Sequence, residues 1–70
     1  MNVNQIREYL KTKIGTNVLV VYYGSRNRKE KYKGVICQLY RNIFTIKLKS
    51  GEIKSFSYID ILTKNIVIHI

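Results

Sequence analysis

The chain has 70 residues, of which 46% are hydrophobic, and carries a formal net charge of +9. This length predicts a single domain, 1–70, with a small core, and the apolar content exceeds that of disordered chains. No apolar stretch approaches the roughly 20 residues that span a bilayer, so we expect no membrane segment. The only cysteine, Cys37, has no partner for an internal disulfide, which favours a cytoplasmic location; we expect its side chain in the core.

Residues 2–14 are predicted to form an amphipathic helix. Asn2 and Gln5 have the spacing of a capping box, and Gly15 is suited to the position after the helix. One apolar stripe recurs at steps of three and four residues and consists of Val3, Ile6, Leu10 and Ile14. We therefore expect these four side chains to face the rest of the domain.

From residue 17 onward the apolar period changes to two, which predicts strands at 17–23, 32–41, 43–49, 53–58 and 65–70. Residues 59–63 fit a single 3₁₀ turn. The first strand is apolar on both sides, so we expect one side in the core and the other under the N-terminal helix or a second subunit. The side chains expected inward on later strands are Phe44, Ile46, Leu48, Ile66, Ile68 and Ile70, with Thr45, Lys47, Lys49 and His69 outward. The fold class is therefore mainly β: a small SH3-like or Sm-like five-stranded barrel over 17–70, preceded by a helix.

A basic segment between Gly24 and Gly34 is the main candidate site, and it is predicted to be a loop. Lysine and arginine contact phosphates and acidic surfaces, and tyrosines beside them can stack on bases. The alternative interpretation is a solvated hairpin that binds no ligand. Part of the positive charge can also reflect genomic bias, because A/T-rich codons favour lysine. The residues predicted to contact a partner are Arg26, Arg28, Lys29, Lys31, Lys33, Tyr23 and Tyr32, with Tyr22 and Tyr40 near the same strand ends.

The remaining polar residues favour structural roles. Lys47, Lys49 and Lys54 are predicted to project together from a hairpin, where lysines commonly protect exposed strands from edge pairing. Asp60 is predicted to cap the short turn before the last strand. Single residues of this kind supply neither a metal-ligand set nor an acid–base pair, so we expect no metal, no cofactor and no enzymatic activity.

Three stretches of the sequence resemble the Veg family of small proteins from Gram-positive bacteria. Gly24-Ser25-Arg26-Asn27-Arg28 resembles the Gly-Gly-Arg-Arg-Lys loop of that family, with serine and asparagine replacing a glycine and an arginine. Residues 34–40 and 43–44 resemble its second and third strands. The most specific stretch is Ser55-Phe56-Ser57-Tyr58-Ile59-Asp60-Ile61-Leu62-Thr63, which is similar to the family pattern Ser-Tyr-Ser-Tyr-x-Asp-Ile-Leu-Thr.

The resemblance implies an SH3-like or Sm-like barrel that stimulates biofilm formation through indirect control of transcription, by relieving a repressor of matrix genes. The expected partner is then a transcription regulator or another acidic protein surface. Two alternatives stay open: direct binding of RNA or DNA by the barrel, and a structural subunit of a homo-oligomer, which the two-sided apolar first strand favours.

Overall fold

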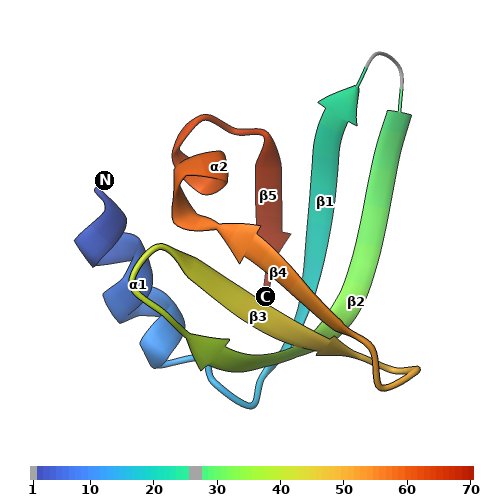
Figure 1. Ribbon diagram of the computed structural model, residues 1–70, viewed down its shortest axis with the longest axis horizontal. Coiled ribbons are helices and arrows are strands. Elements are labelled where there is room, and N and C mark those ends of the chain that lie inside the picture. Colours follow the sequence, from blue (N-terminus) through green and yellow to red (C-terminus); the bar gives the residue numbers. More distant parts are fainter. Residues whose placement is uncertain (1, 26–27) are drawn as a thin grey trace.

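One antiparallel sheet of five strands, accompanied by two short helices, makes up the fold (Figure 1). The computed structural model describes residues 2–25 and 28–70. The elements in chain order are α1 (Val3–Lys11), β1 (Asn17–Ser25), β2 (Arg28–Leu39), β3 (Ile43–Leu48), β4 (Ile53–Ser57), α2 (Tyr58–Leu62) and β5 (Ile66–His69). The predicted fold class, mainly β with a helix at the N-terminus, is therefore confirmed.

Helix α1 begins as predicted and ends early. The Asn2 side chain accepts a hydrogen bond from the Gln5 N–H at 2.9 Å, and the Gln5 side chain accepts from the Asn2 N–H at 2.9 Å, which completes the capping box. Thr12 caps the C-terminus, so the inward placement of Ile14 is wrong and its side chain is 50% exposed. Gly15 instead belongs to the turn after the helix, where it has a φ of 85° and donates to the Ile36 carbonyl at 2.9 Å.

The strands are ordered β4-β3-β2-β1-β5, and each neighbouring pair is antiparallel. Strands β4 and β5 are the edges of this open sheet, and α2 joins them where a closed barrel would have a ladder of hydrogen bonds (Figure 1). The joining segment forms an α-helical turn instead of the predicted 3₁₀ turn. Ser57 caps its start by accepting from the Ile59 N–H at 3.1 Å, and the Thr63 N–H donates to the Ile59 carbonyl at 2.9 Å.

The core lies between the inner face of the sheet and α1. Ile6 and Leu10 of α1 pack in one buried cluster with sheet residues such as Val20 and Ile46. Tyr58 of α2 joins this cluster with 0% exposure. Its ring stacks on Phe44 with centroids 5.8 Å apart, and its hydroxyl donates to the Tyr40 carbonyl at 2.8 Å.

Three predicted side-chain positions are wrong because of local irregularities. The register of β2 against β3 shifts between Ile36 and Gln38, which leaves Cys37 unpaired and half-buried instead of in the core. Beside this bulge, Thr45 is buried rather than exposed, and its hydroxyl exchanges long hydrogen bonds of 3.3 and 3.4 Å with the Gln38 backbone. Ile70 follows the last residue of β5 and is half exposed, not inward.

Candidate functional site

The basic segment is part of a β-hairpin rather than a loop. Residues 28–33 belong to β2 and pair with β1, so that Lys31 lies opposite Val21 and Lys33 opposite Leu19. The predicted strand 32–41 therefore begins four residues too late, and the prediction of a loop is wrong for residues 28–31. The nine-residue strand β1 needs partners for its backbone groups, and β2 supplies them along its length. Arg26, predicted as a contact residue, and Asn27 lie outside the described residues.

Strand alternation divides the predicted contact residues between two faces of the sheet. Lys29, Lys31 and Lys33 share the outer face, away from the buried cluster. Glu30 and Tyr32 share the inner face, since Tyr32 pairs with the fully buried Val20. The hairpin thus brings the three lysines together and separates Tyr32 from them.

Tyr23 joins the three lysines, and we call Lys29, Lys31, Lys33 and Tyr23 the lysine face. The Lys29 Nζ lies 5.6 Å from the centre of the Tyr23 ring, a cation–π distance, and Tyr23 is 40% exposed. Alternate residues of a strand are about 6.6–6.8 Å apart, so the three lysines are attached along this face at regular intervals. Arg28 is exposed at the end of the hairpin, where it pairs with Ser25.

No carboxylate lies on the lysine face. Glu8 is on α1, Glu30 is on the inner face, Glu52 is in the turn before β4, and Asp60 is on α2; these are all the acidic residues of the chain. The positive charge of this face is therefore not neutralised within the chain, which is the electrostatic condition for attracting an anionic partner.

An apolar strip borders the lysine face on β1 and β5. Val21 is only 4% exposed although it lies outside the main buried cluster, because it is flanked in the sheet by Lys31 on one side and Val67 on the other. In the adjacent row, Leu19 lies between Lys33 and His69, which is exposed as predicted. Both helices pack on the inner face, so α1 does not cover the outer side of β1; of the two covers expected there, the helix is wrong and a second subunit stays a prediction. Sequence reasoning registered the apolar first strand but missed this strip as a part of the site.

Tyr32 makes contacts with other side chains of the protein on the inner face. Its hydroxyl donates to Glu30 Oε2 at 2.6 Å, and this hydrogen bond raises the pKa of the Tyr32 phenol. Its ring lies 5.7 Å from that of Phe56, and the Lys54 Nζ lies 5.4 Å above it. A hydrogen-bonded ring between two neighbours is poorly placed to stack on a ligand.

The three lysines near the second hairpin also divide. Lys54 pairs with the buried Ile46 and forms an ion pair with Glu52 at 3.7 Å, so it faces inward. Lys47 and Lys49 are exposed and line, together with Lys33, a hollow of about 450 Å³ over Gly34. The prediction that all three project together is wrong, and two of them extend the positive surface beyond the lysine face.

The described residues contain no group of three or more histidine, cysteine and acidic side chains that can hold a metal ion. The prediction that Asp60 caps the short turn before the last strand is wrong, because Ser57 caps α2 and Asp60 lies in the first turn of this helix. Within 2–25 and 28–70, no helix has both the length and the apolar character needed to cross a membrane.

These observations define a small, basic, mainly β protein whose candidate site is one exposed face of a sheet. A comparison with family models identifies it more closely: the model of the biofilm formation stimulator VEG matches residues 1–69, and the chain belongs to this family. No curated protein matches the chain.

The stretch with the most specific resemblance, residues 55–63, has an architectural role in the fold. Ser57 and Thr63 supply the two caps of α2, and the Thr63 hydroxyl donates to the Ile59 carbonyl at 3.0 Å. Tyr58 anchors the turn between β2 and β3 through its hydrogen bond to Tyr40. This segment therefore holds the two edges of the open sheet in place.

Proposed function

We propose that this Veg-family protein stimulates biofilm formation by binding, with the lysine face docked on an acidic surface of a cytoplasmic transcription regulator. The observation that supports this most is the row of Lys29, Lys31 and Lys33 on a face without a carboxylate. The chain would act as a non-catalytic regulator, which fits a site made of ammonium groups, one phenol ring and an apolar strip.

The two parts of the face make different contributions to binding. Ammonium groups at the rim of an interface accelerate association by electrostatic steering and add little to the final affinity. Leu19, Val21 and Val67 form the apolar strip. Because Val21 is already buried, the half-buried Leu19 and Val67 are the side chains that a partner can cover, and apolar groups at the centre of an interface supply most of the affinity. The acidic surface of the partner is therefore expected to surround an apolar patch.

The test replaces Lys29 and Lys31 by glutamate in a strain whose biofilm depends on this protein. The matched control carries Lys11→Glu and Arg41→Glu, the same change in net charge at exposed positions away from the lysine face. We expect the first variant to lose both biofilm stimulation and the expression of a matrix-gene reporter, while the control keeps both. Equal activity of the two variants, with normal circular dichroism, would contradict the proposal.

Direct binding of nucleic acid is a second candidate, favoured by the exposed ring of Tyr23 beside Lys29. Fluorescence anisotropy of labelled single-stranded DNA, duplex DNA and RNA at about 50 and 200 mM salt tests it. Three phosphate contacts predict a slope of log affinity against log salt of about −2 to −3. Tyr23→Ala would weaken single-strand binding through the loss of stacking, whereas generic attraction to a +9 protein would not respond to this change.

A further inference from the structure

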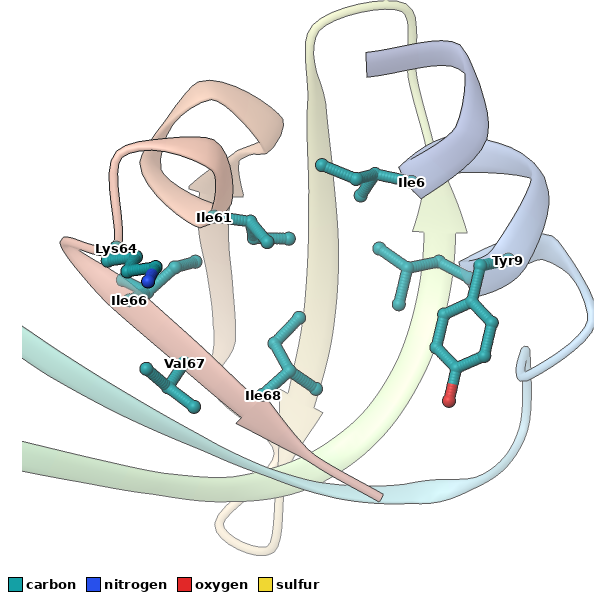
Figure 2. A pocket seen from close by; sticks show the side chains of 8 residues that line it. Ile6, Tyr9, Ile61, Lys64, Ile66, Val67 and Ile68 are labelled. Atoms are coloured by element: carbon teal, nitrogen blue, oxygen red, sulfur yellow. The ribbon is translucent and has the colours of Figure 1, made fainter. Parts of the chain in front are cut away.

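An apolar groove of about 460 Å³ lies between α1, α2 and β5 (Figure 2). Tyr9 of α1 forms one wall, Ile61 of α2 lies at one end, and three residues of β5, Ile66, Val67 and Ile68, form the other wall. Tyr9 is 52% exposed, so this wall is accessible to a partner. The groove lies outside the lysine face, and it shares only Val67 with the surface that the proposed function uses.

The groove runs along the edge of β5 rather than over one face of the sheet. Consecutive residues of a strand point to opposite faces, yet Ile66, Val67 and Ile68 all line the groove. A hollow that touches three consecutive residues must therefore follow the backbone. Strand β5 is also the last strand of the sheet, and within residues 2–25 and 28–70 it pairs with β1 alone.

The register shows which backbone groups of β5 are free. The Tyr23 N–H donates to the Asn65 carbonyl at 2.7 Å, which makes these two residues a hydrogen-bonded pair. In an antiparallel ladder such pairs alternate with non-hydrogen-bonded pairs. Ile66 and Ile68, opposite Tyr22 and Val20, are therefore non-hydrogen-bonded toward β1, and their N–H and C=O groups point to the groove side.

We infer that this groove binds an extended peptide segment that adds a sixth strand to the sheet along β5. The backbone of the segment would exchange hydrogen bonds with Ile66 and Ile68, and its alternate side chains would enter the apolar space beside Tyr9 and Ile61. The segment has apolar residues at every second position, as required for one buried face.

Charge identifies the occupant as a segment of an acidic protein. Of the described residues that line the groove, Lys64 alone is charged, and the chain as a whole carries +9. A second copy of this chain would bring the same positive charge to the edge and repel the first. An acidic residue flanking the apolar positions of the segment would instead pair with Lys64.

The probe is an end-blocked peptide of about eight residues with valine at every second position and glutamate or threonine between. Two further peptides carry backbone N-methyl groups, one on the valines and one on the intervening residues. Only one edge of an added strand pairs with β5, so we expect one of the two methylated peptides to bind about 30-fold more weakly and the other to match the parent. Isotope-edited NMR on the full chain should place the largest amide shifts at Ile66 and Ile68.

Protein variants complete the test. Tyr9→Glu and Lys64→Glu should weaken binding, while Tyr40→Glu and Lys49→Glu, similar changes at exposed positions outside the groove, should not. Absence of binding, or equal binding of both methylated peptides, would overturn the inference. Dimerisation with protection of the Ile66 and Ile68 amides in the absence of peptide would also overturn it, in favour of a second copy. Lys29→Glu and Lys31→Glu should leave peptide binding intact, so failure here is distinguishable from failure of the proposed function.

Discussion

Replacing Tyr58 with phenylalanine removes the hydroxyl of a fully buried tyrosine and with it one hydrogen bond. Tyr58 is 0% exposed, and its hydroxyl donates to the Tyr40 carbonyl at 2.8 Å. The change keeps the stacking on Phe44 and deletes one hydrogen bond, at a cost of about 1–1.5 kcal/mol in the free energy of unfolding. For a domain of this size that loss lowers the melting temperature by about 4–12 °C. Tyr58→Ala also creates a cavity and costs about 3–5 kcal/mol, a large share of the total stability of a small domain.

Urea unfolding followed by circular dichroism measures the loss, and Tyr40→Phe is the matched control. The Tyr40 hydroxyl bonds to Gln38 in an exposed position, so its removal should cost less than about 0.5 kcal/mol. Equal losses for Tyr58→Phe and Tyr40→Phe would refute the argument that the buried hydroxyl anchors the turn between β2 and β3. A changed slope of unfolding free energy against urea would also refute it, because the substitution is expected to leave the surface exposed on unfolding unchanged.

Three further predictions concern the hairpins and the helix cap. Gly34→Ala should destabilise the fold by about 1–3 kcal/mol in urea unfolding, because a Cβ there would lie 2.6 Å from the Lys47 carbonyl oxygen; a neutral result would show that β3 can move away. Since the pKa of Tyr32 is raised in the folded state by its bond to Glu30, the stabilisation from this bond is complete below about pH 10 and lost as pH rises through the folded pKa. Glu30→Gln should therefore make a tyrosine ionise at lower pH in an ultraviolet titration, and an unchanged curve would contradict this. Asn2→Ala should cost about 1 kcal/mol through loss of the capping box, whereas Asn2→Ser should cost little in the same unfolding assay.

The apolar period predicted α1 and the five strands, although not the short helix α2, and the ends of these elements were set by contacts that the period does not encode. The amphipathic stripe continues to Ile14, but α1 ends at Lys11 because the chain must turn at Gly15 to bond with Ile36. The bulge at Cys37 likewise depends on the fit between two strands. The early end of α1 and the bulge at Cys37 therefore come from tertiary contacts, in segments whose helix or strand type was predicted correctly.

The basic segment was predicted as a loop because glycines and charged residues usually mark turns. Its own period was a strand signal: Lys29, Lys31 and Lys33 alternate with Glu30 and Tyr32. The inner positions of this segment are polar or aromatic instead of aliphatic, so the alternation alone did not indicate a strand. The pairing of β2 with β1 shows that it is one. Gly34 is the clearest case, because the close approach of the Lys47 carbonyl, not a turn, requires a glycine there.

The sequence was enough to predict that Lys29, Lys31 and Lys33 belong to the candidate site. It was not enough to predict which other side chains share their face of the sheet. Tyr23 and Tyr32 are equivalent in the sequence as aromatic neighbours of basic residues, and only the register places one on each face. The groove beside β5 was beyond sequence reasoning altogether. It depends on α1 meeting the last strand, and no local pattern reports a contact between the two ends of a chain.

Strand β5 contributes to both proposed surfaces, and the spacing of the sheet determines whether they cooperate. The Val67 side chain belongs to the apolar strip of the lysine face, while the backbone of Ile66 and Ile68 faces the groove. A strand added to β5 would be three inter-strand steps from the lysines of β2, or about 14 Å. This exceeds the Debye length of about 8 Å at physiological ionic strength, so charges on the added strand are screened from Lys31. One partner that uses both surfaces would therefore show additive losses for Lys31→Glu and Lys64→Glu, within about 0.5 kcal/mol in a double-mutant cycle. A larger coupling energy would mean that the two surfaces form one continuous interface.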